Sequence, residues 1–190
     1  MLPPGWRECV STDSLIDSMT ALLPKDNFSK VLDPCCGSGK LVSVVSNRVS
    51  SEEAVGVDIV GNVVESATST YPEIDFIQSD SSEELDLSDD FDLVIGALPL
   101  GVRYGKRQVT TEISTNNTSD VILYRSLLKL KPAGIGIFLA AHNFLIGKDS
   151  KAITNSLSSK GINPIGVFYV ANPLGERSGI PGVIIIFRRD

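Results

Sequence analysis

The chain has 190 residues, with 23 acidic against 17 basic side chains, one histidine, three cysteines and a formal net charge of −6. A hydrophobic fraction of 42% and a charged fraction of 21% exclude disordered and fibrous chains, and the length predicts a single domain over residues 1–190, without a separate target-recognition domain. The cysteine and histidine content predicts a reducing, cytoplasmic setting and no metal. The apolar runs are too short to span a membrane, so we expect no membrane partner. The acidic balance argues against wholesale electrostatic capture of nucleic acid.

Helical patterns alternate with short strand-like runs along the chain. Helices are predicted at 12–23, 40–49, 62–70, 120–130 and 150–160, and strands at 30–34, 54–60, 74–80, 91–98, 134–141, 164–171 and 182–189. The fourth helix is expected to stop at Lys131-Pro132. This alternation predicts a three-layer, Rossmann-like α/β fold with a mostly parallel seven-stranded sheet. No helical pattern separates the last two strands, so we expect an antiparallel closing hairpin there.

A glycine turn joins the first predicted strand to the second helix. Residues 31–41 have the sequence VLDPCCGSGKL, in which Gly37 and Gly39 allow positive φ or a close approach of the backbone to a ligand. Pro34 and Leu41 exclude a Walker A loop. Val42 stands at the third glycine position of the dinucleotide fingerprint. The turn therefore does not favour a pyrophosphate ligand.

An acidic residue lies at the end of each of three successive strands, namely Asp33, Asp58 and Asp80. Each of them alone could simply cap a following helix. In a parallel sheet all three lie at one edge, and Asp58 follows the turn by about 20 residues, the spacing of an acid that binds ribose hydroxyls. Together they favour a ligand site at this edge over three separate helix caps.

These segments resemble the class I S-adenosylmethionine-dependent methyltransferases, and most closely the N6-adenine DNA methyltransferases, including the modification subunits of type I restriction systems. The resemblance covers nearly the whole chain, through segments 10–23, 33–39, 55–60, 79–85, 91–101, 127–145 and 166–187. It implies S-adenosylmethionine as the cofactor. The cofactor-binding residues that it implies are Thr12, Asp33, Cys35, Gly37, Gly39, Asp58, Ile59 and Asp80.

The catalytic motif of that family is altered in this chain. After the fourth strand the family carries Asn or Asp, two prolines and an aromatic residue, whereas segment 97–101 has the sequence ALPLG. Ala97 lacks a side-chain acceptor for the target amine, and Leu100 lacks a ring to stack on a flipped base. Their loss costs about 3 kcal/mol in the barrier and about 1–3 kcal/mol in base binding. Only Leu98 and Pro99 are left to line the transfer site.

Three hypotheses for function follow. The chain is an active methyltransferase with another acceptor, or a catalytically degenerate subunit that supports a partner enzyme, or a nicotinamide-dependent oxidoreductase. The third is disfavoured by Val42 and by the predicted closing hairpin. Nucleic acid is the expected partner, DNA before RNA, and a separate specificity subunit could supply its recognition.

The segment after the fourth strand carries the candidate acceptor-binding residues. Arg103, Tyr104 and Arg107 could bind phosphates and stack on a base, with Lys106 beside them. A solvated mobile loop is the commoner interpretation of such a composition. Residues 110–120 are expected to form a lid that is disordered or becomes ordered by the substrate. Segment 172–181 also faces the expected site.

Two further residue types have possible roles in chemistry. His142 follows the fifth predicted strand and could act as a general base, although a structural role is the commoner one for such a histidine. Cys35 and Cys36 lie in the glycine turn without an activating base in the sequence, so we expect them to be small turn residues and not nucleophiles.

Overall fold

Seven strands form one sheet in the computed structural model, which describes residues 12–24, 27–171, 173 and 181–190, apart from the side chains of Tyr104, Asn143 and Leu145. The strands of this sheet are β1 (Lys30–Asp33), β2 (Glu53–Asp58), β3 (Asp75–Gln78), β4 (Phe91–Ala97), β7 (Leu130–Ala141), β8 (Ile162–Val170) and β9 (Gly182–Arg189). They lie in the order β3-β2-β1-β4-β7-β9-β8. Strand β9 runs antiparallel to β7 and β8, and the other neighbours pair in parallel. The predicted fold class and closing hairpin are confirmed.

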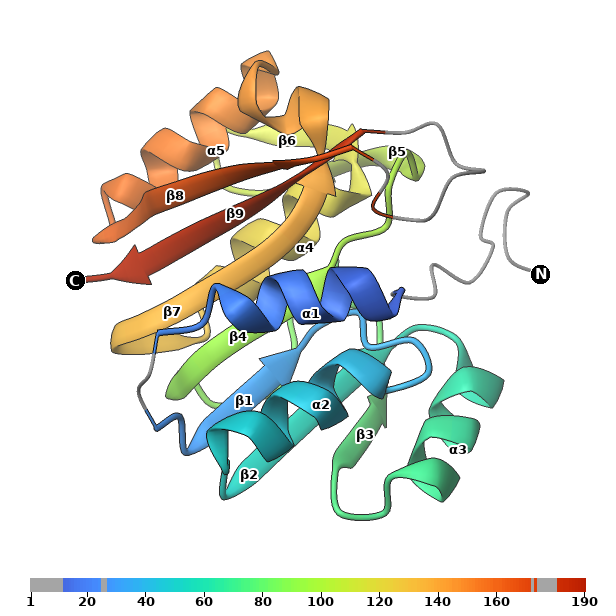
Figure 1. Cartoon of the computed structure of the whole chain (residues 1–190). Helices are drawn as coiled ribbons and strands as arrows, with labels where there is room; N and C mark the ends of the chain where they lie inside the picture. Colours follow the sequence, from blue (N-terminus) through green and yellow to red (C-terminus); the bar gives the residue numbers. More distant parts are fainter. Residues whose placement is uncertain (1–11, 25–26, 172, 174–180) are drawn as a thin grey trace.

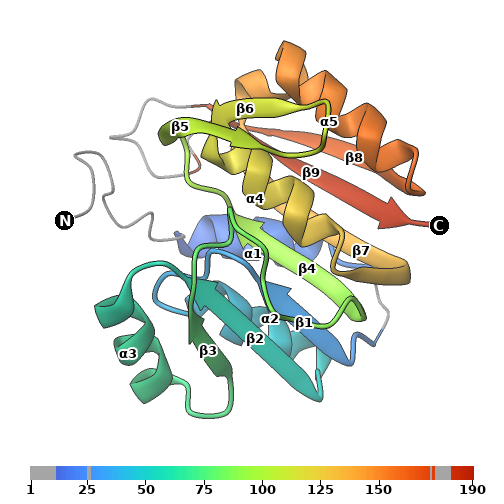
Figure 2. The same ribbon diagram turned by 180° about the vertical axis from the view of Figure 1, so that it is seen from behind.

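Helices cover both faces of this sheet. They are α1 (Asp13–Ala21), α2 (Lys40–Val49), α3 (Gly61–Thr70), α4 (Thr118–Leu127) and α5 (Lys148–Ser158), with a 3₁₀ turn η1 (His142–Leu145) before α5. Helices α1 and α2 lie in front of the sheet in Figure 1, and α4 comes to the front when the molecule is turned in Figure 2. Helix α3 packs beside β2 and β3. These are three layers with the parallel strands at the centre.

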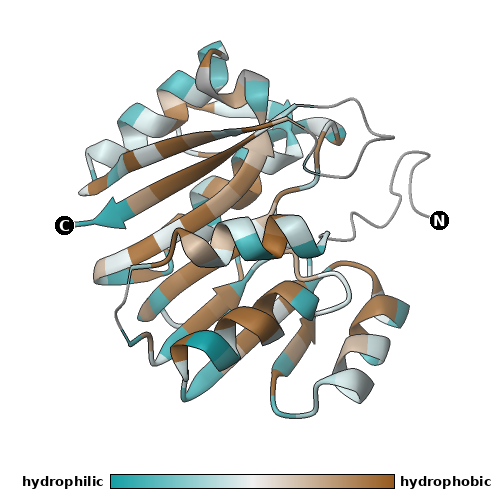
Figure 3. Ribbon diagram, in the orientation of Figure 1, coloured by the Kyte–Doolittle hydropathy of each residue, from teal (hydrophilic) through white to brown (hydrophobic). Residues whose placement is uncertain are grey.

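Two hydrophobic clusters fill the space between the layers. One joins α1 and α2 to the sheet and contains the buried side chains Met19, Val42 and Ile95. The other joins α4 and α5 to the opposite face through residues such as Leu123 and Leu157. Figure 3 shows this as brown strands in the interior and paler helices outside. Because both faces are covered, the central strands are continuous apolar runs rather than alternating ones.

A second, two-stranded sheet replaces the flexible lid expected after the fourth strand. Strand β5 (Arg103–Gln108) pairs antiparallel with β6 (Ser114–Asn117), and the hairpin lies next to α4 (Figure 2). The Thr110 hydroxyl accepts hydrogen bonds from the backbone N–H groups of Glu112 and Ile113, which closes the turn. The expectation of a disordered segment was wrong, because a polar composition does not reveal this turn chemistry.

Strand β7 begins earlier than expected and contains Pro132. Helix α4 ends at Leu127, and the chain is already in strand at Leu130. The pairing with β4 shifts between Leu130 and Ile135, so Pro132 lies in a bulge, where its missing N–H leaves no ladder bond unmade. No helix of the described residues is long and apolar enough to cross a membrane.

Candidate functional site

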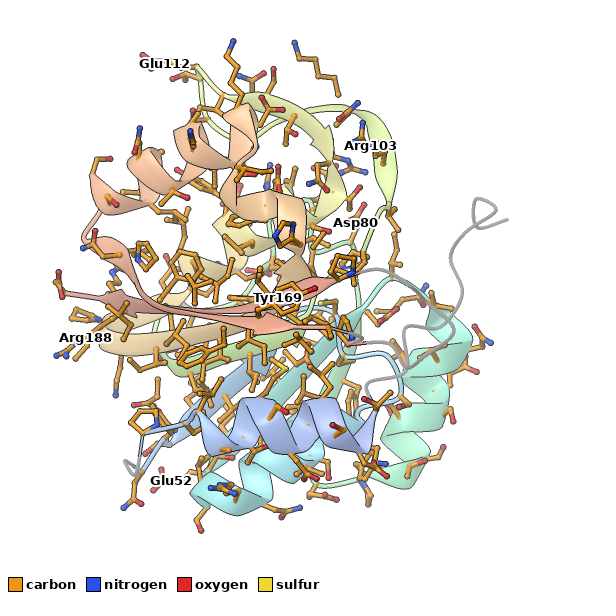
Figure 4. All side chains as sticks on the ribbon, turned by 45° about the horizontal axis from the view of Figure 1, so that its top comes forward. Glu52, Asp80, Arg103, Glu112, Tyr169 and Arg188 are labelled. Atoms are coloured by element: carbon orange, nitrogen blue, oxygen red, sulfur yellow. The ribbon has the colours of Figure 1, made fainter. Side chains whose placement is uncertain are left out.

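The three predicted acids lie along one edge of the sheet, at the carboxyl ends of β1, β2 and β3. Asp33 and Asp58 are the last residues of their strands, and Asp80 follows β3 by two residues. Figure 4 shows Asp80 and Arg103 at the side of the molecule away from Glu52 and Arg188, which mark the other edge. In open α/β sheets, ligands bind outside the carboxyl ends of the strands. The candidate site is therefore this edge.

The loops at this edge are held together by specific hydrogen bonds. Asp58 accepts from the backbone N–H of Gly37 at 2.9 Å through one carboxylate oxygen and from the N–H of Val60 at 3.0 Å through the other. The Ser81 hydroxyl donates to the carbonyl of Pro34 at 2.5 Å. The turn after β1 is thus fixed to the ends of β2 and β3 at once. Ser81 was not predicted, because a serine in a polar loop carries no signal in sequence.

Asp33 is the most buried acid of the site, with 1% of its surface exposed. Burial, opposed by the N–H of Cys35 and reinforced by the charge of Asp58, raises the pKa of Asp33 to about 8. Burial, together with the negative charges of Asp33 and Asp58, also raises the pKa of the Cys36 thiol. A thiol held in its protonated form is a poor nucleophile. The structure thus gives the expected turn role of Cys36 a physical basis.

The two glycines of the turn have different surroundings. Gly39 has φ +79°, and a Cβ there would lie 2.6 Å from the ring of Phe76. Gly37 has φ +52°, and a Cβ there would meet no atom within 4 Å. Gly39 is therefore required for packing against β3, whereas the open side of Gly37 leaves room for a ligand beside the Asp58 carboxylate.

We expect Gly39→Ala and Gly37→Ala to separate folding from ligand binding. Gly39→Ala combines left-handed strain with overpacking and should lower the free energy of unfolding by about 2–4 kcal/mol. Gly37→Ala should cost only about 1 kcal/mol in stability, because only the backbone strain applies. It should nevertheless weaken cofactor binding. Urea unfolding and calorimetric titration of both variants test this, and equal losses of stability would contradict it.

Asp80 is engaged by residues on both sides of it. One carboxylate oxygen accepts from the backbone N–H of Ser82 at 2.9 Å and from its hydroxyl at 2.5 Å. The other accepts from Arg107 at 3.1 Å. Arg107 also forms an ion pair with Glu83. The structure therefore brings together an expected cofactor residue and an expected acceptor residue, for which the sequence predicts separate roles.

Thr12 and Ile59, two further expected cofactor residues, flank the turn. Thr12 is the N-cap of α1, where its hydroxyl oxygen accepts from the N–H of Leu15 at 3.2 Å. In the first turns of their helices, Asp13 of α1 and Lys40 of α2 form an ion pair, which joins α1 to the glycine turn. Ile59 directly follows Asp58 and is half-buried.

Leu98 and Pro99, the residues after β4 that are expected to line the transfer site, form a segment (the transfer segment) that is more enclosed than the sequence suggests. The Leu98 side chain is 1% exposed and packs in the core on the α4 side, and its N–H donates to the carbonyl of Leu139 at 3.0 Å. The carbonyl of Pro99 accepts from the Ser119 hydroxyl at 2.5 Å. The Cys35 thiol lies 3.3 Å from the carbonyl of Ala97 and is placed to donate to it, which links the glycine turn to this segment.

The remaining expected residues lie around this edge. Arg103 is exposed on β5, and the backbone of Tyr104 follows it in the same strand. His142 is exposed, and its ring meets that of Tyr169 edge to face at 6.0 Å. Apart from residues 173 and 181, segment 172–181 lies outside the described residues. Within the described part of the chain, no group of three or more metal-ligating side chains is placed to hold an ion.

Comparison with known proteins is consistent with this architecture. Residues 31–115 match a family described as a methyltransferase domain. A structure assigned as a class I S-adenosylmethionine-dependent methyltransferase of Listeria monocytogenes superposes with a TM-score of 0.80 at 19% identity, over 95% of this chain and 61% of the other. The fold is that of the class I methyltransferases. The family match and this methyltransferase neighbour support S-adenosylmethionine as the cofactor.

A second solved structure has a similar fold, and another protein is similar in sequence over half of this chain. A modification subunit assigned to a type I restriction enzyme of Vibrio vulnificus YJ016 superposes with a TM-score of 0.78 at 16% identity, over 93% of this chain and 43% of the subunit. A protein provisionally named methyltransferase 235L, from Invertebrate iridescent virus 6, is 29% identical over 94 residues, which are 50% of this chain and 35% of the viral protein. The chain thus spans about a third to three fifths of the length of these relatives.

Proposed function

We propose that this chain binds S-adenosylmethionine at the carboxyl edge of its sheet and transfers the methyl group to an acceptor in nucleic acid, more readily in DNA than in RNA. The observation that carries the proposal is the hydrogen-bonded junction of the three strand ends around Asp58. The cofactor is a cation without phosphates, so acids suit it better than a phosphate cradle. The acidic edge and the open side of Gly37 fit it.

Each acid has a separate task in this proposal. Asp58 binds the ribose hydroxyls, Asp80 accepts from the adenine amino group, and Asp33 faces the amino group of the methionine part or orders the turn. The bound cofactor supplies an already activated methyl group. The protein therefore has mainly to position an acceptor in line with it and to exclude water.

The choice of nucleic acid as acceptor rests on the hairpin next to the transfer segment. Arg103 and Lys106 are exposed on β5, within ten residues of Pro99 in the sequence. Basic side chains at such a place can hold a phosphate backbone while a base enters the site. The fold shared with a restriction-modification subunit agrees with this acceptor class.

A second candidate function is a subunit that binds cofactor without catalysis. It is favoured by Ala97 and Leu100, which remove the polar acceptor and the stacking ring of the N6-adenine motif. In that case the chain supports a partner that performs the transfer. Both candidates predict cofactor binding, and only the first predicts turnover.

Methyl transfer from labelled S-adenosylmethionine to DNA, to RNA and to protein extract distinguishes the two candidates. Incorporation into nucleic acid by the wild type, lost in Asp58→Ala, supports the enzyme. If no label is incorporated into any of the acceptors while the cofactor still binds, the result supports the second candidate. Incorporation into protein alone would refute the nucleic-acid acceptor.

Restoring the family motif tests whether the residues at positions 97 and 100 limit adenine methylation. We expect Ala97→Asn combined with Leu100→Tyr to raise adenine methylation of DNA above the wild-type level, by up to about 100-fold for a regained preorganised contact. Leu98 is kept, because a proline there would remove the hydrogen bond to Leu139 and the buried side chain. Leu100→Tyr alone is the matched control. Equal rates in all three proteins would show that this motif does not limit the reaction.

A further inference from the structure

Arg107 joins the acceptor-side hairpin to the cofactor-side acid Asp80. The arginine lies on β5, 27 residues along the chain from Asp80, and its guanidinium donates to the Asp80 carboxylate at 3.1 Å. The Arg107 and Asp80 side chains are 25% and 26% exposed, so water screens this pair only in part. Together with the ion pair between Arg107 and Glu83, this partly buried pair links the hairpin directly to the loop after β3.

The surrounding contacts fix the orientation of the Asp80 carboxylate. Ser82 holds one oxygen through its backbone N–H and its hydroxyl, and Arg107 holds the other. Glu83 binds the same guanidinium through its other terminal nitrogen, which holds the arginine beside Asp80. A carboxylate held at both oxygens cannot rotate freely, and each oxygen still has acceptor capacity. Such an oxygen can meet a ligand amino group with little loss of freedom on binding.

We infer that Arg107 is a positioning residue that makes Asp80 selective for the 6-amino group of the cofactor's adenine and couples cofactor binding to the hairpin. This inference rests on the proposed function, and it adds a role for the hairpin that acceptor binding alone would not require. With Arg107 in place, the ligand amino group donates to a carboxylate that is already oriented. Without Arg107, that carboxylate turns, and the hairpin loses its attachment to the cofactor side.

The test compares two ligands that differ only at the position that Asp80 is inferred to recognise. One is S-adenosylhomocysteine, and the other is its analogue with hydrogen in place of the 6-amino group. Calorimetry gives both dissociation constants for the wild type, for Arg107→Ala and for Arg107→Lys. We expect the wild type to prefer the amino ligand and Arg107→Ala to reduce that preference by about tenfold, the size of one charge-assisted hydrogen bond. Arg107→Lys should recover part of it.

Matched controls separate positioning from general stabilisation. Arg103→Ala removes a cation from the same strand and should leave the preference unchanged. If Arg107→Ala weakens both ligands by the same factor, or neither, the arginine does not position Asp80 and the inference is overturned. If the wild type binds neither ligand, the proposed function itself fails, so the two failures are distinguishable.

Hydrogen exchange of residues 103–117 tests the coupling without reference to affinity or activity. At saturating S-adenosylhomocysteine, these amides should exchange more slowly than in the free wild-type protein, and the slowing should be lost in Arg107→Ala. Glu83→Gln, which leaves the contact with Asp80 in place, should retain most of it. Equal slowing in the wild type and in Arg107→Ala would overturn the coupling.

Discussion

Replacing Asp58 by alanine is expected to weaken the binding of S-adenosylmethionine by at least about tenfold. Two effects act together in this variant. The ribose hydroxyls lose a charged acceptor, and the Gly37 and Val60 amides lose the oxygens that hold the turn in place. Hydrogen bonds to charged groups contribute about 1.5–3 kcal/mol each, so tenfold is the lower limit of the expected loss. Titration calorimetry measures it directly.

Glu53→Ala is the matched control for Asp58→Ala. Glu53 is the first residue of the same strand, at the opposite edge of the sheet, where it pairs with Lys30. It should leave cofactor affinity unchanged. If Asp58→Ala retains wild-type affinity, or if the wild type binds no cofactor at millimolar concentration, the proposed site is wrong. A parallel titration with NADH tests the oxidoreductase hypothesis, which requires NADH to bind in preference to the methyl donor.

Replacing Asp33 by asparagine is expected to remove a strong pH dependence of stability. The pKa of Asp33 is about 8 in the folded protein, against an ordinary value of 3.8. Between these values the folded state keeps a proton that the unfolded state has released, so this group's contribution to stability falls as pH rises from about 4 to about 8. The slope is up to about 1.4 kcal/mol per pH unit, and the total is of the order of 6 kcal/mol. Asparagine cannot ionise, yet it can still accept from the Cys35 N–H.

Urea unfolding of the wild type and of Asp33→Asn between pH 6 and pH 8 checks this prediction. As pH rises, the free energy of unfolding of the variant should increase relative to that of the wild type. The pKa of Asp120 is raised to about 6, mainly by burial, so its titration lies below most of this range and is shared by both proteins. Parallel curves would show that Asp33 is ionised throughout. Asp33 should release its proton when a cationic ligand binds, so wild-type cofactor affinity should increase toward pH 8.

The mostly parallel sheet, its antiparallel closing hairpin and the positions of the acids could be predicted from the sequence by itself. Apolar runs of strand length, separated by helical stripes, predict parallel strands covered on both faces. The sequence between the last two strands has no helical pattern, which predicts the antiparallel direction that β9 has in the structure. Asp33 and Asp58 end their strands and Asp80 follows its own closely, so the topology alone brings them to one edge. These are properties of local pattern and chain connection, which sequence records directly.

Contacts between segments distant in the chain were decided only by the tertiary structure. The pairing of Arg107 with Asp80 depends on the hairpin, and the hairpin depends on a turn closed by Thr110, a residue with no distinctive signal. The burial that raises the pKa of Asp33 is likewise a property of packing and not of composition. The excess of 23 acids over 17 bases therefore acquires a local meaning: some of the acids line the proposed cofactor site, where a nearby arginine from the acceptor side holds one of them. Side chains that are distant in the sequence become partners because folding brings them close together. Local sequence patterns do not reveal which side chains will meet in this way.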